Sequence, residues 1–140
     1  MERILEVASY HPWLATATAV LAALVAVYEM RARAESLISV SPQELIRLMN
    51  QGAVLLDLRP AEQYQAGHLA GARLVTGEQL LEPSDSLKRH KEKAVVVYDD
   101  SGSAGAAAAR QLARQGFTRA FTLRGGLAAW RADNLPLTRA

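Results

Sequence analysis

The first apolar stretch of the chain is long and carries no charge. It covers residues 13–28, from Trp13 to Tyr28. At about 1.5 Å per residue, a helix of this length with one added turn approaches the roughly 30 Å hydrocarbon layer of a bilayer. The two aromatic residues stand at its ends, where interfacial aromatics belong, and Pro12 suits a first helical turn. The pattern predicts one transmembrane helix that meets the lipid bilayer through Trp13 to Tyr28.

A cleaved signal peptide is the alternative explanation of this stretch. Ala32-Arg33-Ala34 resembles a small-x-small cleavage site, but the residues before the apolar run include two glutamates against one arginine. A signal peptide begins with a positively charged region, and this segment is a poor match to one. Arg31 and Arg33 follow the span, so the positive-inside rule places the rest of the chain in the cytoplasm, by a bias of two charges. We expect a single-pass membrane protein.

Small residues recur at every fourth position within the predicted span. They are Ala15, Ala19 and Ala23. Such a stripe lets a second helix approach closely, whereas alanine can also be ordinary apolar filler, and both readings stay open. The first reading predicts packing against a membrane protein or against a second copy of this chain, which would make a homo-oligomer.

After the anchor, short apolar runs alternate with stretches of helical spacing. A connector is expected over residues 31–39, with an anchor over 1–34 and a domain over 35–140. Apolar runs rich in branched side chains predict strands over 53–56, 73–75, 94–98 and 119–123. Helical spacing predicts helices over 42–50, 60–65, 77–81, 105–115 and 127–132. This alternation is typical of an α/β domain with a mainly parallel sheet.

The run 94–98 and the loop after it are the centre of this pattern. The loop 99–104 joins a buried strand to a helix, so its backbone N–H groups converge on one spot and form an anion cradle. An ordinary strand-to-helix turn is the alternative. Any chemistry in the chain is expected here.

Composition limits the chemistry available. The chain has 140 residues, half of them hydrophobic, no cysteine and a net charge of +2. The absence of cysteine excludes disulfides, thiolate metal sites and cysteine nucleophiles. No second histidine lies at a metal-ligand spacing, and the loop falls short of a dinucleotide fingerprint, so neither a metal nor a cofactor is expected. The small net charge gives no support for nucleic-acid binding.

Several short motifs occur in order along the domain. They are Asp57-Leu58-Arg59, Glu62, Tyr64, Gly67-His68-Leu69-Ala70-Gly71-Ala72, the loop 99–104, Gly116-Phe117, Leu123-Arg124-Gly125-Gly126 and Trp130. In this order they resemble the signatures of rhodanese-like domains over about residues 38–136. The resemblance implies a small parallel sheet flanked by helices. It also implies a loop whose first residue is a cysteine that carries sulfur as a persulfide, often with an arginine five positions later. A span before one such domain resembles a group of bacterial inner-membrane proteins.

This chain departs from that pattern in the loop itself. Asp99 stands at the cysteine position and Ala104 at the frequent arginine position, whereas Gly102 and the loop length are kept. A carboxylate cannot become a persulfide, and it repels thiosulfate-like anions. We expect a vestigial active-site loop made of Asp99, Asp100, Ser101, Gly102, Ser103 and Ala104. We also expect the Asp99 carboxylate to replace the anionic sulfur species in the cradle.

Three further residues are expected to support the loop. Asp57 and Arg59 could form a site pair, or the carboxylate could cap its own turn while the guanidinium braces neighbouring loops. His68 could be an acid–base group or a packed structural histidine. The structural alternative is favoured for all three.

The sequence therefore predicts a membrane-anchored, catalytically inactive rhodanese-like domain that acts as a protein-binding or scaffolding module. One alternative is a sulfurtransferase-related enzyme of weak or altered activity that uses Asp99. Another is a domain that works with a thiol from a partner chain. An aspartyl-phosphate enzyme would need further carboxylates for a metal, and only Asp133 is acidic downstream of the loop.

Overall fold

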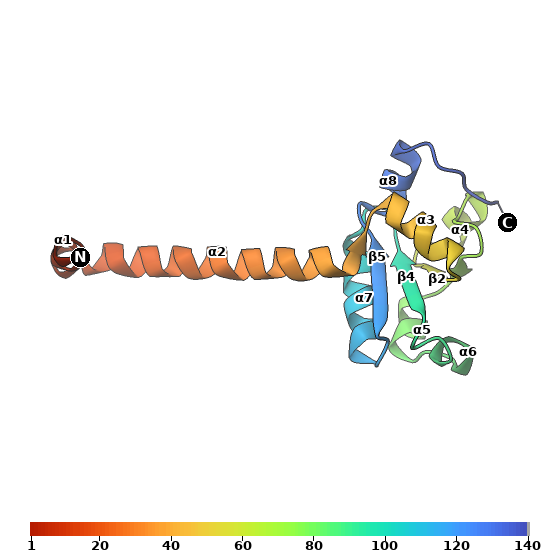
Figure 1. Ribbon diagram of the computed structural model, residues 1–140, viewed down its shortest axis with the longest axis horizontal. Helices are drawn as coiled ribbons and strands as arrows, with labels where there is room; N and C mark the ends of the chain where they lie inside the picture. The colour runs from red at the N-terminus through yellow and green to blue at the C-terminus, as the bar shows by residue number, and fades with distance from the viewer. Residues whose placement is uncertain (140) are drawn as a thin grey trace. The chain divides into compact units, whose positions relative to one another are not determined.

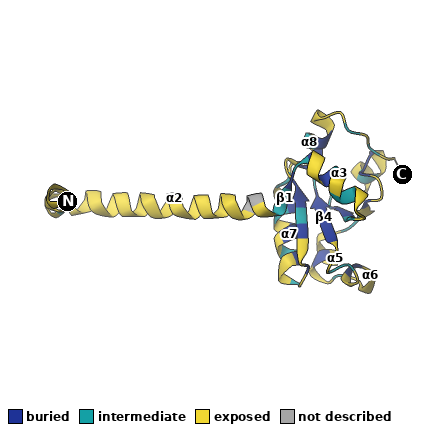
Figure 2. Ribbon diagram, viewed as in Figure 1, coloured by how far each residue is buried: buried dark blue, intermediate teal, exposed yellow. Residues whose placement is uncertain are grey.

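The computed structural model describes residues 1–139, apart from the side chains of residues 35 and 36. Contacts divide the chain into two units, Met1–Glu35 and Ser36–Ala140. The first unit holds α1 (Glu2–Tyr10), which was not predicted, and most of α2 (Pro12–Ile38) (Figure 1). The stretch Pro12–Ala34 is long and apolar enough to cross a membrane, and none of its most apolar window is buried (Figure 2).

The predicted connector over residues 31–39 is helical as far as Ile38. The helix α2 continues through the charged residues to Ile38, and the next two residues form a strand. Alanine, arginine and glutamate are good helix formers, so the charges after Tyr28 end the apolar stretch without ending the helix.

The second unit is built on a parallel sheet of five strands. In sheet order these are β1 (Ser39–Val40), β5 (Arg119–Leu123), β4 (Ala94–Tyr98), β2 (Val54–Asp57) and β3 (Arg73–Leu74). Every neighbouring pair is parallel. The four predicted strands are present, each within about one residue of its predicted bounds, whereas β1 was missed. β4 lies at the centre and all of its residues are buried, as its unbroken apolar run predicted.

Within residues 36–139, six helices surround this sheet. They are α3 (Pro42–Asn50), α4 (Ala61–Ala66), α5 (Gly77–Leu81), α6 (Asp85–Lys88), α7 (Ser103–Arg114) and α8 (Gly126–Ala132). Side-chain caps fix several helix starts: the Ser41 hydroxyl accepts from the N–H of Glu44, and Thr76 and Gln79 form a capping box. Only α6 was not predicted.

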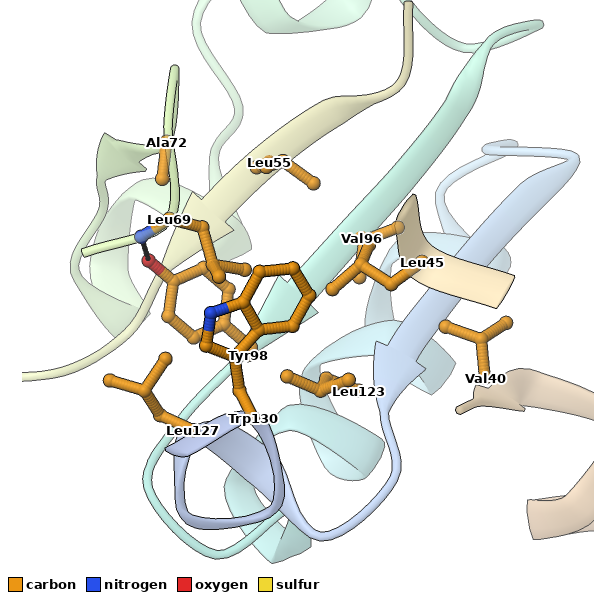
Figure 3. Packing of buried hydrophobic residues seen from close by; sticks show 10 residues of the cluster. All are labelled: Val40, Leu45, Leu55, Leu69, Ala72, Val96, Tyr98, Leu123, Leu127 and Trp130. Carbon is orange, nitrogen blue, oxygen red and sulfur yellow. Dashed lines mark hydrogen bonds between the residues drawn. The ribbon is translucent and has the colours of Figure 1, made fainter. Parts of the chain in front are cut away.

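The central strand divides the core into two halves, because its side chains alternate between the faces of the sheet. Val96 and Tyr98 lie with Leu45 of α3 and with Leu127 and Trp130 of α8, in the cluster that Figure 3 shows. The opposite face is covered by side chains from α5, α6 and α7. This second cluster includes Val95, Val97, Leu80, Leu87, Ala108, Ala109 and Leu112. The sheet is therefore covered on both faces, as predicted.

The parallel arrangement brings the carboxyl ends of β2 and β4 to one edge of the sheet. Asp57 pairs in register with Tyr98, and the loop that begins at Asp99 follows directly. The two acidic positions singled out from the sequence, Asp57 and Asp99, therefore belong to adjacent strand ends.

Candidate functional site

The Asp99 carboxylate lies inside the loop that follows β4. Its Oδ1 atom accepts a hydrogen bond from the N–H of Gly102 at 2.7 Å, and its Oδ2 atom accepts one from the N–H of Ala104 at 3.2 Å. The hydroxyl of Ser101 lies 3.4 Å from the same Oδ2. Asp99 is half-buried. Two backbone N–H groups of the loop therefore donate to a carboxylate of the same chain.

The loop is shorter than predicted. The expected loop ended at Ala104, but α7 already begins at Ser103. Gly102 adopts a φ of +100°, which turns the chain into the helix and which a residue with a side chain rarely adopts. The Asp99 carboxylate then satisfies the N–H of Ala104 in the first helical turn, which has no partner within the helix.

The backbone of the loop is held from the other side by α8. The N–H groups of Leu127 and Ala128 donate to the carbonyls of Asp99 and Asp100 at 2.8 and 3.0 Å. A Cβ atom on Gly126 would lie 2.5 Å from the Asp100 carbonyl, so only glycine permits this approach. Gly126 of the 123–126 motif therefore allows α8 to dock on the loop.

The other loop residues point outward. The Asp100 side chain is 53% exposed, and its Oδ1 lies 3.8 Å from Nη1 of Arg59. Ser101 and Ser103 are exposed, and their hydroxyl oxygens lie 3.2 Å from each other. The loop thus presents a carboxylate and two hydroxyls at its outer rim.

Asp57 and Arg59 form a buried ion pair under the loop. Nη2 of Arg59 lies 2.8 Å from Oδ2 of Asp57, and the N–H of Arg59 donates to Oδ1 at 2.8 Å. Nη2 also donates to the carbonyl of Gly67. Burial opposes the charged form of Arg59, but the hydrogen bond and the charge of Asp57 outweigh it, so the pKa of Arg59 is raised. Asp57 caps its own turn and Arg59 braces the loop at Gly67, which is the structural alternative of the sequence analysis.

Tyr98 is a member of this network that sequence reasoning missed. Its hydroxyl accepts a hydrogen bond from the N–H of Leu69 at 3.1 Å. Burial, aided by the charge of Asp57, raises the pKa of Tyr98 far above its ordinary value, so it stays a neutral phenol. Its position as the last residue of a buried strand, directly before the loop, was the available signal.

His68 is packed as a structural residue. Its ring stacks on Tyr64 with centroids 3.9 Å apart, and Nδ1 lies 2.8 Å from the carbonyl of Tyr64. Its backbone exchanges two hydrogen bonds with Thr138. The residue therefore fixes the segment 67–72 against the C-terminal segment.

An apolar groove lies beside the loop. It has a volume of about 430 Å³ and is lined by Leu58, Gly77, Leu80, Leu81, Ala104, Ala108 and Gln111. Leu81 is 61% exposed there. Ala104 therefore contributes a methyl group to this groove at the position where the family resemblance implies a cation.

The remaining predicted residues lie in the other unit. Ala15, Ala19 and Ala23 are exposed along α2, and their packing against another helix stays a prediction. Among residues 1–139, no group of three or more histidine, cysteine, aspartate or glutamate side chains is placed to hold a metal ion.

Known proteins are similar to this chain in sequence. The family of the Rhodanese-like domain matches residues 41–133. YibN, an uncharacterized protein of Escherichia coli strain K12, is 33% identical over 141 residues, which cover 99% of each chain. The thiosulfate sulfurtransferase GlpE of Pseudomonas entomophila is 31% identical over 93 residues, 66% of this chain and 84% of that protein.

Solved structures agree on the fold. The Alr3790 protein of Anabaena sp. superimposes with a TM-score of 0.62 and 28% identity, over 71% of this chain and 80% of that chain. The matched family region contains the loop, the buried pair and most of the sheet. The chain therefore belongs to the rhodanese-like domain family and has the fold of the sulfurtransferases, without a cysteine.

Proposed function

We propose that this chain is a catalytically inactive rhodanese-like domain, anchored in a membrane, that acts as a protein-binding or scaffolding module on the cytoplasmic side. One observation supports this proposal above the others: the Asp99 carboxylate accepts the N–H groups of Gly102 and Ala104. The backbone N–H groups that would bind an anionic sulfur species are therefore already bonded to a carboxylate of the same chain.

The chemistry of the loop argues against sulfur transfer. A thiolate is the nucleophile in such reactions, and the chain contains no cysteine. An incoming anion would meet the exposed carboxylate of Asp100. Arg59 offers no compensation, because it is 4% exposed and its guanidinium is bonded to Asp57 and to the carbonyl of Gly67.

The groove beside the loop supports a protein-binding role. With alanine at position 104, the rim of the groove has a methyl group, and Leu81 lies largely exposed beside it. Exposed apolar surface next to a functional loop is typical of interaction sites. An apolar segment of a protein is the occupant that this lining favours.

The anchor supports a role at the membrane. The apolar stretch Pro12–Ala34 has the length and composition of a span. The match to YibN covers 99% of both chains, so a relative has the same combination of N-terminal segment and domain. Arg31 and Arg33 follow the apolar residues, which favours a cytoplasmic domain.

A turnover assay tests the inactive assignment. The full chain in detergent micelles should show no thiosulfate:cyanide sulfur transfer above the rate of the buffer. Turnover that is lost in Asp99→Asn would instead support an enzyme of altered activity.

Photocrosslinking tests the binding role. A photoreactive amino acid placed at Leu81, in the groove, should form a discrete adduct with a protein in membranes. The matched position is Arg47, which is exposed on α3 at the opposite face of the sheet. Equal adduct formation at both positions, or none at Leu81, would contradict a binding role for the groove.

Protease protection tests the topology. Protease added outside spheroplasts should leave the domain uncut, and alkaline carbonate should not extract the chain. Digestion from outside, or a processed soluble form, would favour the signal-peptide alternative.

A further inference from the structure

The helix α1 has an apolar face that nothing in its own unit covers. Ile4, Leu5 and Val7 are 73%, 69% and 58% exposed. With Ala8 they occupy positions i, i+1, i+3 and i+4, which share one side of a helix. The charged and polar side chains of α1 fall on the other side: Glu2, Arg3, Glu6 and Ser9.

Such a helix is not stable by itself in water. α1 has 9 residues, and isolated helices shorter than about 12–15 residues are marginal even with favourable sequences. Its start lacks a side-chain cap, and no basic residue supports its last turn. Burial of its apolar face on a surface would supply the missing stability.

The position of α1 indicates which surface this is. It ends at Tyr10, and the apolar stretch of α2 begins at Pro12, so a single residue separates the two helices. His11 leaves helical geometry with a φ of −134° and a ψ of 70°. Figure 1 views α1 nearly along its axis while α2 runs across the picture, so the chain changes direction at this residue.

We infer that α1 lies in the membrane–water interface, with Ile4, Leu5, Val7 and Ala8 among the lipid chains and its charged side facing water. This inference rests on the membrane anchoring proposed above. Because α1 directly precedes the start of the span, its apolar side is held at the depth of the headgroups, and the aromatic Trp13 belongs to the same layer. The side chains of Glu2, Arg3 and Glu6 carry a net charge of −1, so the apolar contact, rather than attraction to anionic lipid, holds the helix there.

The absence of cysteine makes the test direct. Single cysteines are introduced into the full chain at Ile4 and Leu5 on one side of α1, and at Glu6 and Ser9 on the other. Each is labelled with a nitroxide after reconstitution in vesicles of phosphatidylethanolamine and phosphatidylglycerol. The ratio of oxygen to nickel-chelate collision rates should be several-fold higher at Ile4 and Leu5 than at Glu6 and Ser9. A label at Leu24, in the middle of the apolar stretch, reports insertion of the span.

Three results would overturn the inference. Equal, water-like ratios on both sides of α1 with a buried Leu24 label would refute the interfacial helix and leave the anchor intact. A Leu24 label open to the nickel chelate would refute the anchor as well. Low collision rates with both reagents at Ile4 and Leu5 would show that protein, not lipid, covers this face. If dilution of the chain with added lipid then raises the collision rates, the covering protein is a second copy of this chain.

Discussion

Replacing Asp99 by alanine should lower the melting temperature of the domain. The change removes both oxygens that accept from Gly102 and Ala104. Hydrogen bonds to a charged group contribute about 1.5–3 kcal/mol each. Ala104 is exposed, however, so water replaces part of that bond, and losing a helix cap typically costs about 0.5–2 kcal/mol. Loss of the negative charge near the start of α7 adds about 0.3–1 kcal/mol.

These contributions give an expected loss of about 2 kcal/mol in the free energy of unfolding. For a domain of roughly 100 residues this lowers the melting temperature by roughly 10 °C. Thermal unfolding of the full chain in detergent micelles measures it, with near-UV circular dichroism reporting the buried Trp130. Asp99→Asn keeps an oxygen acceptor without the charge, so it should lose less than Asp99→Ala.

Asp100→Ala is the matched control, because its side chain is 53% exposed and its contact with Arg59 is 3.8 Å long. Its effect should stay within about 0.5 kcal/mol. An Asp99→Ala variant with an unchanged or higher melting temperature would refute the reasoning. The carboxylate would then point into solvent, and the loop would not be a filled anion cradle.

Four further changes have defined outcomes. The double change Asp99→Cys, Ala104→Arg should give a thiol with a pKa below about 8.5 and, after thiosulfate treatment, a mass increase of one sulfur atom, because the thiol would lie at a helix N-terminus among N–H donors. Asp57→Asn should cost about 3–5 kcal/mol in urea unfolding, because it leaves a buried guanidinium without its carboxylate. Burial, with nearby cations, lowers the pKa of His90 from its ordinary 6.5. The unfolded chain therefore binds a proton at this imidazole more readily than the folded chain does. The free energy of unfolding should fall as the pH drops below 6.5, and His90→Gln should reduce this fall. Ala19→Leu should weaken helix association in a membrane reporter assay.

Three of these outcomes have a defined contradiction. A folded double variant with an ordinary thiol pKa and no added sulfur would show that the loop has lost the geometry of its family. A pH dependence that persists unchanged in His90→Gln would assign it to other groups. Replacement of Leu21 or Val25 by another large apolar residue is the control for Ala19→Leu, and equal effects at all three positions would make the alanine stripe apolar filler.

The sequence determined the elements whose pattern is local. The run from Ala94 to Tyr98 is apolar throughout and rich in valine, which predicted a strand covered on both faces, and β4 has those bounds. The order of motifs indicated the rhodanese-like family, which the match over residues 41–133 confirms. Two of the missed elements are short: β1 has two residues and α6 has four, and neither length shows a period.

Only the tertiary structure decided how distant residues meet. Parallel pairing of β2 with β4 puts Asp57 beside Tyr98, whose hydroxyl reaches the N–H of Leu69, 29 positions away. The guanidinium of Arg59 finds the carbonyl of Gly67 for the same reason. These contacts depend on register and packing between segments, which no local pattern encodes. The loop 99–104 depends on both local sequence and tertiary packing. The sequence places a carboxylate at position 99, and the packing of α8 fixes the backbone of the loop around it.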